Sequence, residues 1–216
     1  MHVSRGYLIS FEGLDGAGKT TQLILLETWL AAHQISYLRT REPGGTALGL
    51  AIRHLLLDRP ELEITPLAEA FLFQADRAQH FATIVEPQLA SGTLVITDRC
   101  FDSSIAYQGA GRGLGVELIE HLSLLATQGR VPDLTILLDL DPDRVQLRTD
   151  YTQDKSGQRE RQNHFDREEH AFHIRLHQAF LDLAHKYPER IKVIQAVQPP
   201  DAIHTEIVHA IEALLT

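Results

Sequence analysis

The stretch Gly13-Leu14-Asp15-Gly16-Ala17-Gly18-Lys19-Thr20 decides the fold of this chain. It matches the phosphate-binding pattern G-x-x-x-x-G-K-[ST], which joins a buried strand to the N-terminus of a helix. Residues 7–11 before it form a short apolar run, and residues 21–32 after it carry leucines at helical spacing. This context disfavours the alternative, which is a chance match inside an ordinary turn.

The chemistry of such a loop predicts a nucleoside triphosphate site. Its backbone N–H groups point inward, and the dipole of the following helix favours negative charge. In this interpretation the Lys19 ammonium reaches the outer phosphates, and the Thr20 hydroxyl binds Mg²⁺.

Composition narrows the class of protein. A chain of 216 residues suffices for one α/β domain with a sizeable core. Its formal net charge of −9 gives no broad basic face, so no nucleic-acid partner is expected. The single cysteine, Cys100, excludes an intrachain disulfide and fits a reducing cytoplasm. We find no apolar run of about 18 residues and no signal-peptide pattern, so we expect a soluble cytoplasmic protein without a membrane partner.

Apolar runs of strand length alternate with helix-length segments along the chain. This alternation predicts a parallel sheet with helices on both faces. No linker rich in glycine, proline or serine divides the chain, so we expect a single domain spanning residues 1–216. The predicted strands are residues 7–11, 36–39, 94–97, 134–138 and 191–194.

The loop after the second predicted strand reads Arg-Glu-Pro-Gly-Gly-Thr over residues 41–46. Pro43 and the two glycines prevent a helix there, and the loop falls at the carboxyl edge of the sheet, where ligands bind in such folds. An ordinary turn is the alternative. Arg53 lies in the apolar helix predicted over residues 48–57, and a surface arginine that extends its charge into water is the usual explanation.

Two further segments carry candidate binding residues. Phe73 and Arg77 are one helical turn apart, so they can stack on a base and bond its edge, although a lone phenylalanine is more often a core residue. Asp98 and Arg99 follow an apolar strand. An aspartate at this place is typical of the Mg²⁺ side of a phosphate-loop site, and an arginine binds phosphate bidentately. A surface ion pair between the two is the alternative.

Two polar segments follow. Residues 103–113 read as a polar helix start followed by a flexible glycine loop. Residues 148–167 are the most polar part of the chain, typical of a solvated face or a disordered loop. The functional alternative is a mobile lid that places guanidinium groups over the phosphates and excludes water.

Together these segments resemble the thymidylate kinases, P-loop enzymes that phosphorylate dTMP with ATP. The matching motifs extend over nearly the whole chain. They are Phe11-Glu12-Gly13, Thr40-Arg41-Glu42-Pro43-Gly44-Gly45-Thr46, Phe73-Gln74-Ala75-Asp76-Arg77-Ala78-Gln79-His80, Thr97-Asp98-Arg99, Tyr107-Gln108-Gly109 and Pro132-Asp133-Leu134-Thr135.

The resemblance implies a nucleoside monophosphate kinase fold with a five-stranded parallel sheet and a short lid at about 148–167. It implies ATP as phosphate donor, dTMP as acceptor, Mg²⁺ as cofactor and a homodimer. ATP would bind Gly13, Leu14, Asp15, Gly16, Ala17, Gly18, Lys19, Thr20 and Thr21. The dTMP site would comprise Asp15, Glu42, Pro43, Arg53, Phe73, Arg77, Arg99, Ser104, Tyr107 and Gln108. Catalytic roles would fall to Lys19, Asp98, Arg99, Arg148, Arg159 and Arg161, with Thr20 and Asp98 on the metal.

The family's residue roles are specific. Arg53 and Arg99 would grip the dTMP phosphate, Phe73 would stack on thymine, and Arg77 and Gln108 would bond the base edge. Tyr107 would leave no room for a 2′-OH. Some members of the family have an arginine at the variable positions of the phosphate loop, where this chain has Gly16 and Ala17. The resemblance is therefore to the bacterial type, in which the lid supplies the arginines. Which lid arginine is catalytic stays open.

Three other readings compete with this one, and the least specific of them is a catalytically inactive relative. Another nucleoside monophosphate kinase would share the phosphate loop, but the base-contacting set favours thymine. A P-loop switch that hydrolyses nucleotide slowly would belong to a different class, and the sequence carries no Asn-Lys-x-Asp guanine signature.

Overall fold

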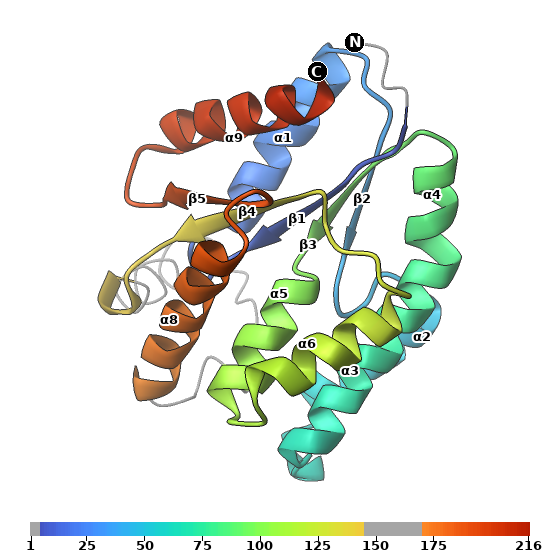
Figure 1. The fold of residues 1–216 in the computed structure, drawn as a ribbon, viewed down its shortest axis with the longest axis vertical. Helices are drawn as coiled ribbons and strands as arrows, with labels where there is room; N and C mark the ends of the chain where they lie inside the picture. The colour runs from blue at the N-terminus through green and yellow to red at the C-terminus, as the bar shows by residue number, and fades with distance from the viewer. Residues whose placement is uncertain (1–4, 145–169) are drawn as a thin grey trace.

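A computed structural model describes residues 5–144 and 170–216 of the chain. Its centre is one five-stranded sheet in the order β2-β3-β1-β4-β5, in which every neighbouring pair is parallel (Figure 1). The predicted parallel sheet is confirmed, and the strands differ from their predicted spans only at the ends. They are β1 (Leu8–Glu12), β2 (Tyr37–Arg41), β3 (Leu94–Asp98), β4 (Leu134–Asp139) and β5 (Ile191–Gln195).

Burial follows the position of each strand in the sheet. All residues of β1 are buried, as are all but the last residue of β3 and of β4. The edge strands β2 and β5 are partly exposed. Strands of a parallel sheet that are covered on both faces read as continuous apolar runs, which is why the three central strands were recognisable in the sequence.

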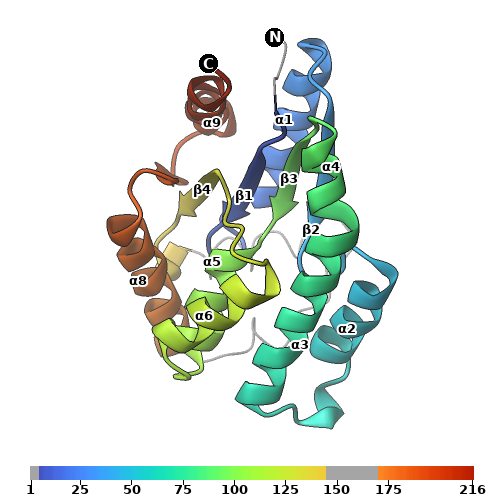
Figure 2. The same ribbon diagram turned by 45° about the vertical axis from the view of Figure 1, so that its right-hand side comes forward.

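Helices cover both faces of the sheet, as the alternating pattern predicts (Figures 1 and 2). On one face α1 (Lys19–Ala32) packs against α9 (Pro200–Leu215). On the other face α4 (Glu86–Ala90) contacts β3, and α8 (His170–Lys186) contacts β5 and α5 (Phe101–Ser104). Three further helices pack side by side, with α3 (Pro66–His80) in contact with both α2 (Ala47–Asp58) and α6 (Val116–Ala126).

Short irregular helices complete the chain. The segment between α2 and α3 contains the 3₁₀-helix η1 (Pro60–Leu62). The π-helix η2 (Phe81–Val85) continues α3 into α4, and the π-helix η3 (Ile105–Gly111) continues α5. None of the helices in the described residues is long and apolar enough to cross a membrane.

The expectation of a flexible glycine loop after residue 108 was wrong over its first part. Gly109 and Gly111 belong to η3 and are buried. A Cβ at Gly111 would lie 2.7 Å from the Phe172 ring and 2.8 Å from Leu176. The glycine there permits α8 to pack closely on η3, so its role is close packing between helices.

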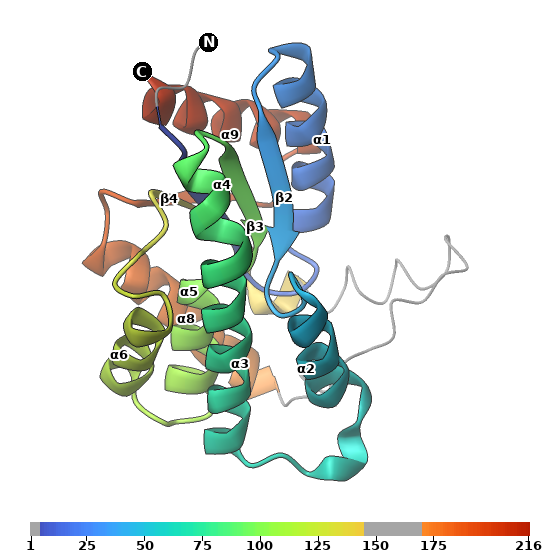
Figure 3. The same ribbon diagram turned by 90° about the vertical axis from the view of Figure 1, so that its right-hand side faces the viewer.

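The parallel arrangement gathers the ends of the strands at one edge of the sheet. Glu12, Arg41, Asp98 and Asp139 are the last residues of β1, β2, β3 and β4. In Figure 3 the arrowheads of β2 and β3 point toward the start of α2. Ligands of open α/β sheets bind outside the carboxyl ends of the strands, so this edge is the place to look for the site.

Candidate active site

The phosphate loop connects β1 to α1 at this edge. Gly13 has φ 127°, and a Cβ there would lie 2.5 Å from the carbonyl oxygen of Leu138 on β4, so only glycine fits. Gly18 is the N-cap of α1 in a left-handed conformation. No side chain among the described residues caps this helix, so its first N–H groups are free to receive an anion.

Lys19 lies inside the loop. Its Nζ donates hydrogen bonds to the carbonyl oxygens of Gly13 at 3.1 Å and Leu14 at 2.9 Å, and lies 3.8 Å from Asp15 Oδ1. Burial and the nearby Arg99 guanidinium lower the pKa of Lys19, while Asp15 opposes that shift. The ammonium is thus held within the loop by acceptors that an incoming phosphate could replace.

Arg99 directly follows β3, and its side chain contacts the phosphate loop. Its Nη2 donates to Asp15 Oδ1 at 2.7 Å and to the Tyr107 hydroxyl at 3.0 Å, and its Nη1 donates to Ser103 Oγ at 3.0 Å. Arg99 has φ 64°, an uncommon conformation for a residue with a side chain. Because Arg99 pairs with Asp15, the alternative of a simple Asp98–Arg99 surface pair does not hold.

Asp15 is the group that joins these two cations. Burial alone would favour its neutral form, but the Arg99 guanidinium and the Lys19 ammonium outweigh it and hold the pKa of Asp15 well below its usual range. Asp15 is therefore ionised throughout the physiological range. An anionic phosphate that enters here would compete with this carboxylate for both cations.

Glu12, quoted above only as part of a motif, is fully buried. Its Oε1 accepts the Cys100 amide at 2.8 Å, and its Oε2 accepts the Ser103 hydroxyl. Burial and repulsion from Asp102 raise the pKa of Glu12 to about 7, although Arg99 favours the ionised form. Sequence reasoning assigned it no role. A charged residue at the end of an otherwise apolar strand was the available signal.

The raised pKa makes stability depend on pH. The ordinary value is 4.5, so between pH 4.5 and about 7 the folded protein binds more protons at Glu12 than the unfolded chain. Stability supplied by this site is present at low pH and is lost as pH rises through 7. We expect the unfolding free energy of the natural protein, relative to that of Glu12→Gln, to fall by about 2 to 3 kcal/mol between pH 5 and pH 8. Urea unfolding at several pH values measures this difference.

The exposed Glu117 supplies the matched control, because its carboxyl lies in water. Glu117→Gln should leave the pH dependence of the unfolding free energy unchanged. If the unfolding free energies of the natural protein and of Glu12→Gln change with pH in parallel, the raised pKa of Glu12 is contradicted.

The loop after β2 is held against α3 by a buried ion pair with Arg77 and a buried hydrogen bond with His80. Glu42 Oε2 accepts Arg77 Nε at 2.8 Å, and its Oε1 lies 2.9 Å from His80 Nδ1. Burial opposes the charged form, but Arg77 and His80 hold the pKa of Glu42 below its usual value. Asp76 Oδ1 accepts the Gly44 amide at 3.1 Å. This segment is therefore an ordered loop at the site.

Arg53 points back to this loop. Its Nη1 donates to the carbonyl oxygen of Pro43 at 3.2 Å, and the residue is half-buried. The alternative of a surface arginine directed into water therefore does not describe it.

The guanidinium of Arg77 is fully buried, and the protein accepts all five of its N–H groups. Phe73, one turn earlier on α3, is partly buried and packs against the core. Beyond Glu42, the Arg77 acceptors are Gln74 Oε1, Ser123 Oγ, the carbonyl oxygen of Cys100 and Ser104 Oγ, at 2.9 to 3.1 Å.

The remaining predicted residues of the acceptor side lie on η3. Tyr107 is buried next to Arg99, whose guanidinium carbon lies 5.0 Å from the centre of its ring. Gln108 is buried, and its Nε2 donates to Glu69 Oε1 at 2.9 Å. The structure thus brings the residues predicted on three separate segments to one edge of the sheet.

Two residues were predicted to hold Mg²⁺. Asp98 ends β3 beside the phosphate loop, and its Oδ1 is buried without a hydrogen-bond partner among the described residues. Thr20 lies in the first turn of α1 with an exposed side chain. A buried unpaired carboxylate oxygen next to a phosphate loop fits a hard cation that takes oxygen ligands.

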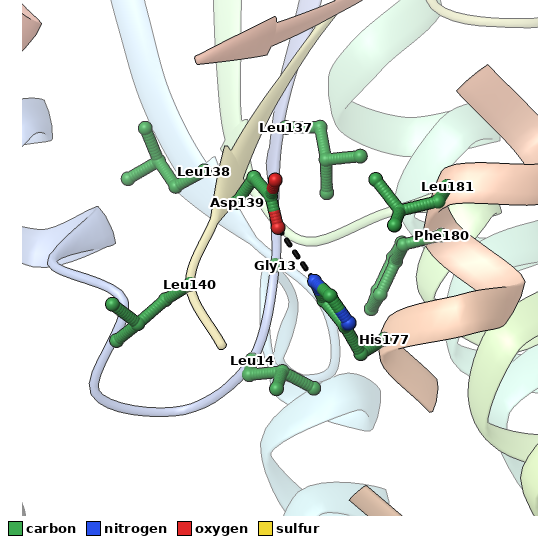
Figure 4. A pocket seen from close by; sticks show the side chains of 9 residues that line it. All are labelled: Gly13, Leu14, Leu137, Leu138, Asp139, Leu140, His177, Phe180 and Leu181. Carbon is green, nitrogen blue, oxygen red and sulfur yellow. Dashed lines mark hydrogen bonds and ion pairs between the residues drawn. The ribbon is translucent and has the colours of Figure 1, made fainter. Parts of the chain in front are cut away.

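A small apolar pocket lies between the start of the phosphate loop, the end of β4 and α8 (Figure 4). Within it a 2.6 Å hydrogen bond joins His177 Nε2 to Asp139 Oδ1. Gln195 Nε2 donates to the other oxygen of Asp139 at 2.6 Å. The first bond ties α8 to β4, against which Gly13 packs, and the second ties β5 to β4. The predicted lid residues Arg148, Arg159 and Arg161 lie outside the described residues.

Comparison with known proteins identifies relatives along almost the entire chain. The family model for thymidylate kinase matches residues 11–207. A thymidylate kinase of Gloeobacter violaceus is 47% identical over 207 residues, which cover 96% of this chain and 95% of that one. One of Bifidobacterium longum is 46% identical over 212 residues, covering 97% and 98%. The crystal structure of thymidylate kinase from Ehrlichia chaffeensis superposes with a TM-score of 0.73 at 33% identity, covering 96% of this chain and 99% of that one.

Proposed function

This chain belongs to the thymidylate kinase family, and from that membership we infer that it transfers the γ-phosphate of ATP to dTMP. The products are dTDP and ADP, and the reaction serves dTTP synthesis. Within the site itself, one contact is the main support for this proposal. Asp15 contacts both Lys19 and Arg99, so a cation for the donor phosphates and a cation for the acceptor phosphate lie next to each other.

The donor half of the reaction uses the phosphate loop. The loop amides from Gly13 to Thr21 cradle the phosphates of ATP, and Lys19 exchanges its two carbonyl partners for phosphate oxygens. This places positive charge where negative charge develops during transfer. Phosphoryl transfer needs alignment and charge neutralisation, and the acceptor is already an anionic phosphate, so no general base is required.

The acceptor half uses the arginines that face the loop. Arg99 and Arg53 bind the phosphate of dTMP, which takes over the role of Asp15 as partner of Arg99. Asp15 is then released toward the sugar. Tyr107 closes the space next to the deoxyribose, and Pro43 packs near the base.

The base binds between α3 and η3. Phe73 stacks on thymine, while Gln108 and Arg77 bond its edge, and Ser104 lies beside them. Because all five Arg77 N–H groups already have protein acceptors, the base shares one of these donors. Glu42 acts through Arg77 and the loop, since its two oxygens are committed to Arg77 and His80.

Mg²⁺ is the cofactor that these residues fit, with Thr20 and Asp98 as the groups that would hold it. When bound, the ion would neutralise part of the negative charge on the reacting phosphates. Arg148, Arg159 and Arg161 are proposed to supply the remaining positive charge, as the family resemblance implies. We place the reaction in the cytoplasm, which fits a chain with one buried free cysteine.

We also propose a homodimer. Exposed apolar side chains lie on α2, α3 and α6, which pack side by side, and apolar surface of this kind marks interaction sites. Sedimentation velocity at micromolar concentration tests this, and a monomer there would exclude it. The side chains are Leu48, Leu50, Leu55, Leu67, Phe71, Leu118 and Leu125.

The proposed reaction is tested by a coupled ADP assay with ATP and Mg²⁺. With dTMP as acceptor we expect the highest kcat/KM, with dUMP lower by about 10-fold to 200-fold, because one methyl group contributes about 1–3 kcal/mol. UMP and CMP should react far more slowly. Both carry a 2′-OH, and CMP also presents a different base edge. ATP hydrolysis that proceeds at the same rate with and without an acceptor would instead support a nucleotide switch.

A further inference from the structure

A buried carboxylate on α3 contacts the amide that we assign to the base. Glu69 is 2% exposed and Gln108 is 1% exposed. Gln108 Nε2 donates to Glu69 Oε1 at 2.9 Å. Arg112 approaches the same carboxylate, with Nε 3.2 Å from Oε1 and Nη2 3.3 Å from Oε2. Neither Glu69 nor Arg112 has a role in the reaction as described above.

This contact determines which way the Gln108 amide points. An ionised carboxylate only accepts hydrogen bonds, and the Arg112 guanidinium beside it favours the ionised form. The amide nitrogen must therefore face Glu69, because the flipped amide would place its oxygen against a carboxylate oxygen. No other described residue bonds this amide, so its oxygen and its second N–H remain for a ligand.

An amide held in one orientation can distinguish two kinds of pyrimidine. Thymine and uracil carry an N3–H donor next to the O4 acceptor, whereas cytosine carries an N3 acceptor next to N4–H donors. A side-chain amide matches the first pattern in one orientation and the second pattern after a flip. An amide that is free to flip would therefore bond both bases.

We propose that Glu69 is a positioning residue that fixes the Gln108 amide for a thymine or uracil edge and thereby excludes cytosine. This inference rests on the proposed function, in which Gln108 bonds the base. Glu69 itself does not touch the substrate. Arg112 supports it by keeping the carboxylate ionised and in place.

The experiment compares acceptors in the natural protein and in Glu69→Gln. A neutral amide at position 69 can accept from Gln108 or donate to it, so both orientations of Gln108 become available. We expect the ratio of kcat/KM for dTMP to that for dCMP to fall at least about tenfold, because a wrongly paired polar edge is what rejects cytosine. The ratio of dTMP to dUMP should stay unchanged, because these two bases share the edge that Gln108 contacts.

Two controls separate positioning from a structural effect. Glu86→Gln breaks a second carboxylate–arginine pair, with Arg130, on the surface, and should leave both ratios unchanged. In a Gln108→Ala background, Glu69→Gln should no longer change the ratio of dTMP to dCMP. If Glu69→Gln does not fold, Glu69→Asp replaces it, because the shorter side chain cannot reach Gln108 and should relax the same ratio.

The outcomes distinguish this inference from the proposed function. If the natural protein does not phosphorylate dTMP, the proposed function is wrong, and the inference that rests on it is wrong too. A natural protein that uses dTMP, with an unchanged dTMP-to-dCMP ratio in the Glu69 variant, overturns the inference alone. An equal loss of activity toward dTMP, dUMP and dCMP would also overturn it, since that result indicates a purely structural role.

Discussion

Replacement of Arg99 by methionine should lower kcat/KM for dTMP by about a thousandfold or more. The guanidinium has a fixed position, because Asp15, Ser103 and Tyr107 accept its hydrogen bonds and its backbone adopts φ 64°. A planar fork in this position binds phosphate bidentately, and loss of such a group from a site of developing charge costs about 4 kcal/mol. Steady-state kinetics with dTMP varied at saturating ATP measures the effect.

Three comparisons make the Arg99 result specific. Arg99→Lys keeps the charge without the fork and should recover only about tenfold. Binding of a non-hydrolysable ATP analogue, measured by calorimetry, should change little in Arg99→Met, because the phosphate loop is intact. Arg130→Met removes an arginine from an exposed pair with Glu86 and should leave the kinetics unchanged. A kcat/KM for Arg99→Met within tenfold of the natural value would remove Arg99 from the acceptor site.

Replacement of Arg77 by methionine should destabilise the protein by about 3–5 kcal/mol. The change leaves the Glu42 carboxylate, which is 4% exposed, without its strongest partner and removes the Arg77 donor from four other buried acceptors. Breaking a buried pair from one side costs this much because a desolvated charge remains. Urea unfolding at pH 7 measures the change in free energy, with the slope of the transition checked for two-state behaviour.

The partner residue tests the cause of this loss. In a Glu42→Gln background no buried charge is left unpaired. Arg77→Met should therefore lower the unfolding free energy by clearly less in that background than it does alone. Arg130→Met again serves as the surface control, where an exposed pair contributes at most about 1 kcal/mol. If Arg77→Met lowers the unfolding free energy by less than about 1 kcal/mol, the buried hydrogen bonds and ion pair of Arg77 do not stabilise the fold as described.

The two arginines also show how stability and function share this edge of the sheet. Arg77 binds the loop of Glu42 to α3 and to α5. Arg99 is instead held by groups that a phosphate can replace. We therefore expect Arg99 variants to lose activity with little change in stability, and Arg77 variants to lose both.

Short-range patterns in the sequence determined the fold class. The central strands are continuous apolar runs because both their faces are buried, and the glycine loop between a strand and a helix locates the nucleotide site. The position of Asp98 and Arg99 after an apolar strand places them at the carboxyl edge for the same reason. These signals lie within a few residues of one another, so no knowledge of tertiary contacts is needed to recognise them.

Only the tertiary structure decided which polar residues meet. Glu69 and Gln108 are 39 positions apart, and Glu12 and Ser103 are 91 apart, so no local pattern connects them. The glycines at 109 and 111 read as a flexible loop because a short sequence window cannot show the ring of Phe172 that packs on Gly111. A buried polar group acquires its role from the partners that satisfy it, and those partners are set by how the elements pack.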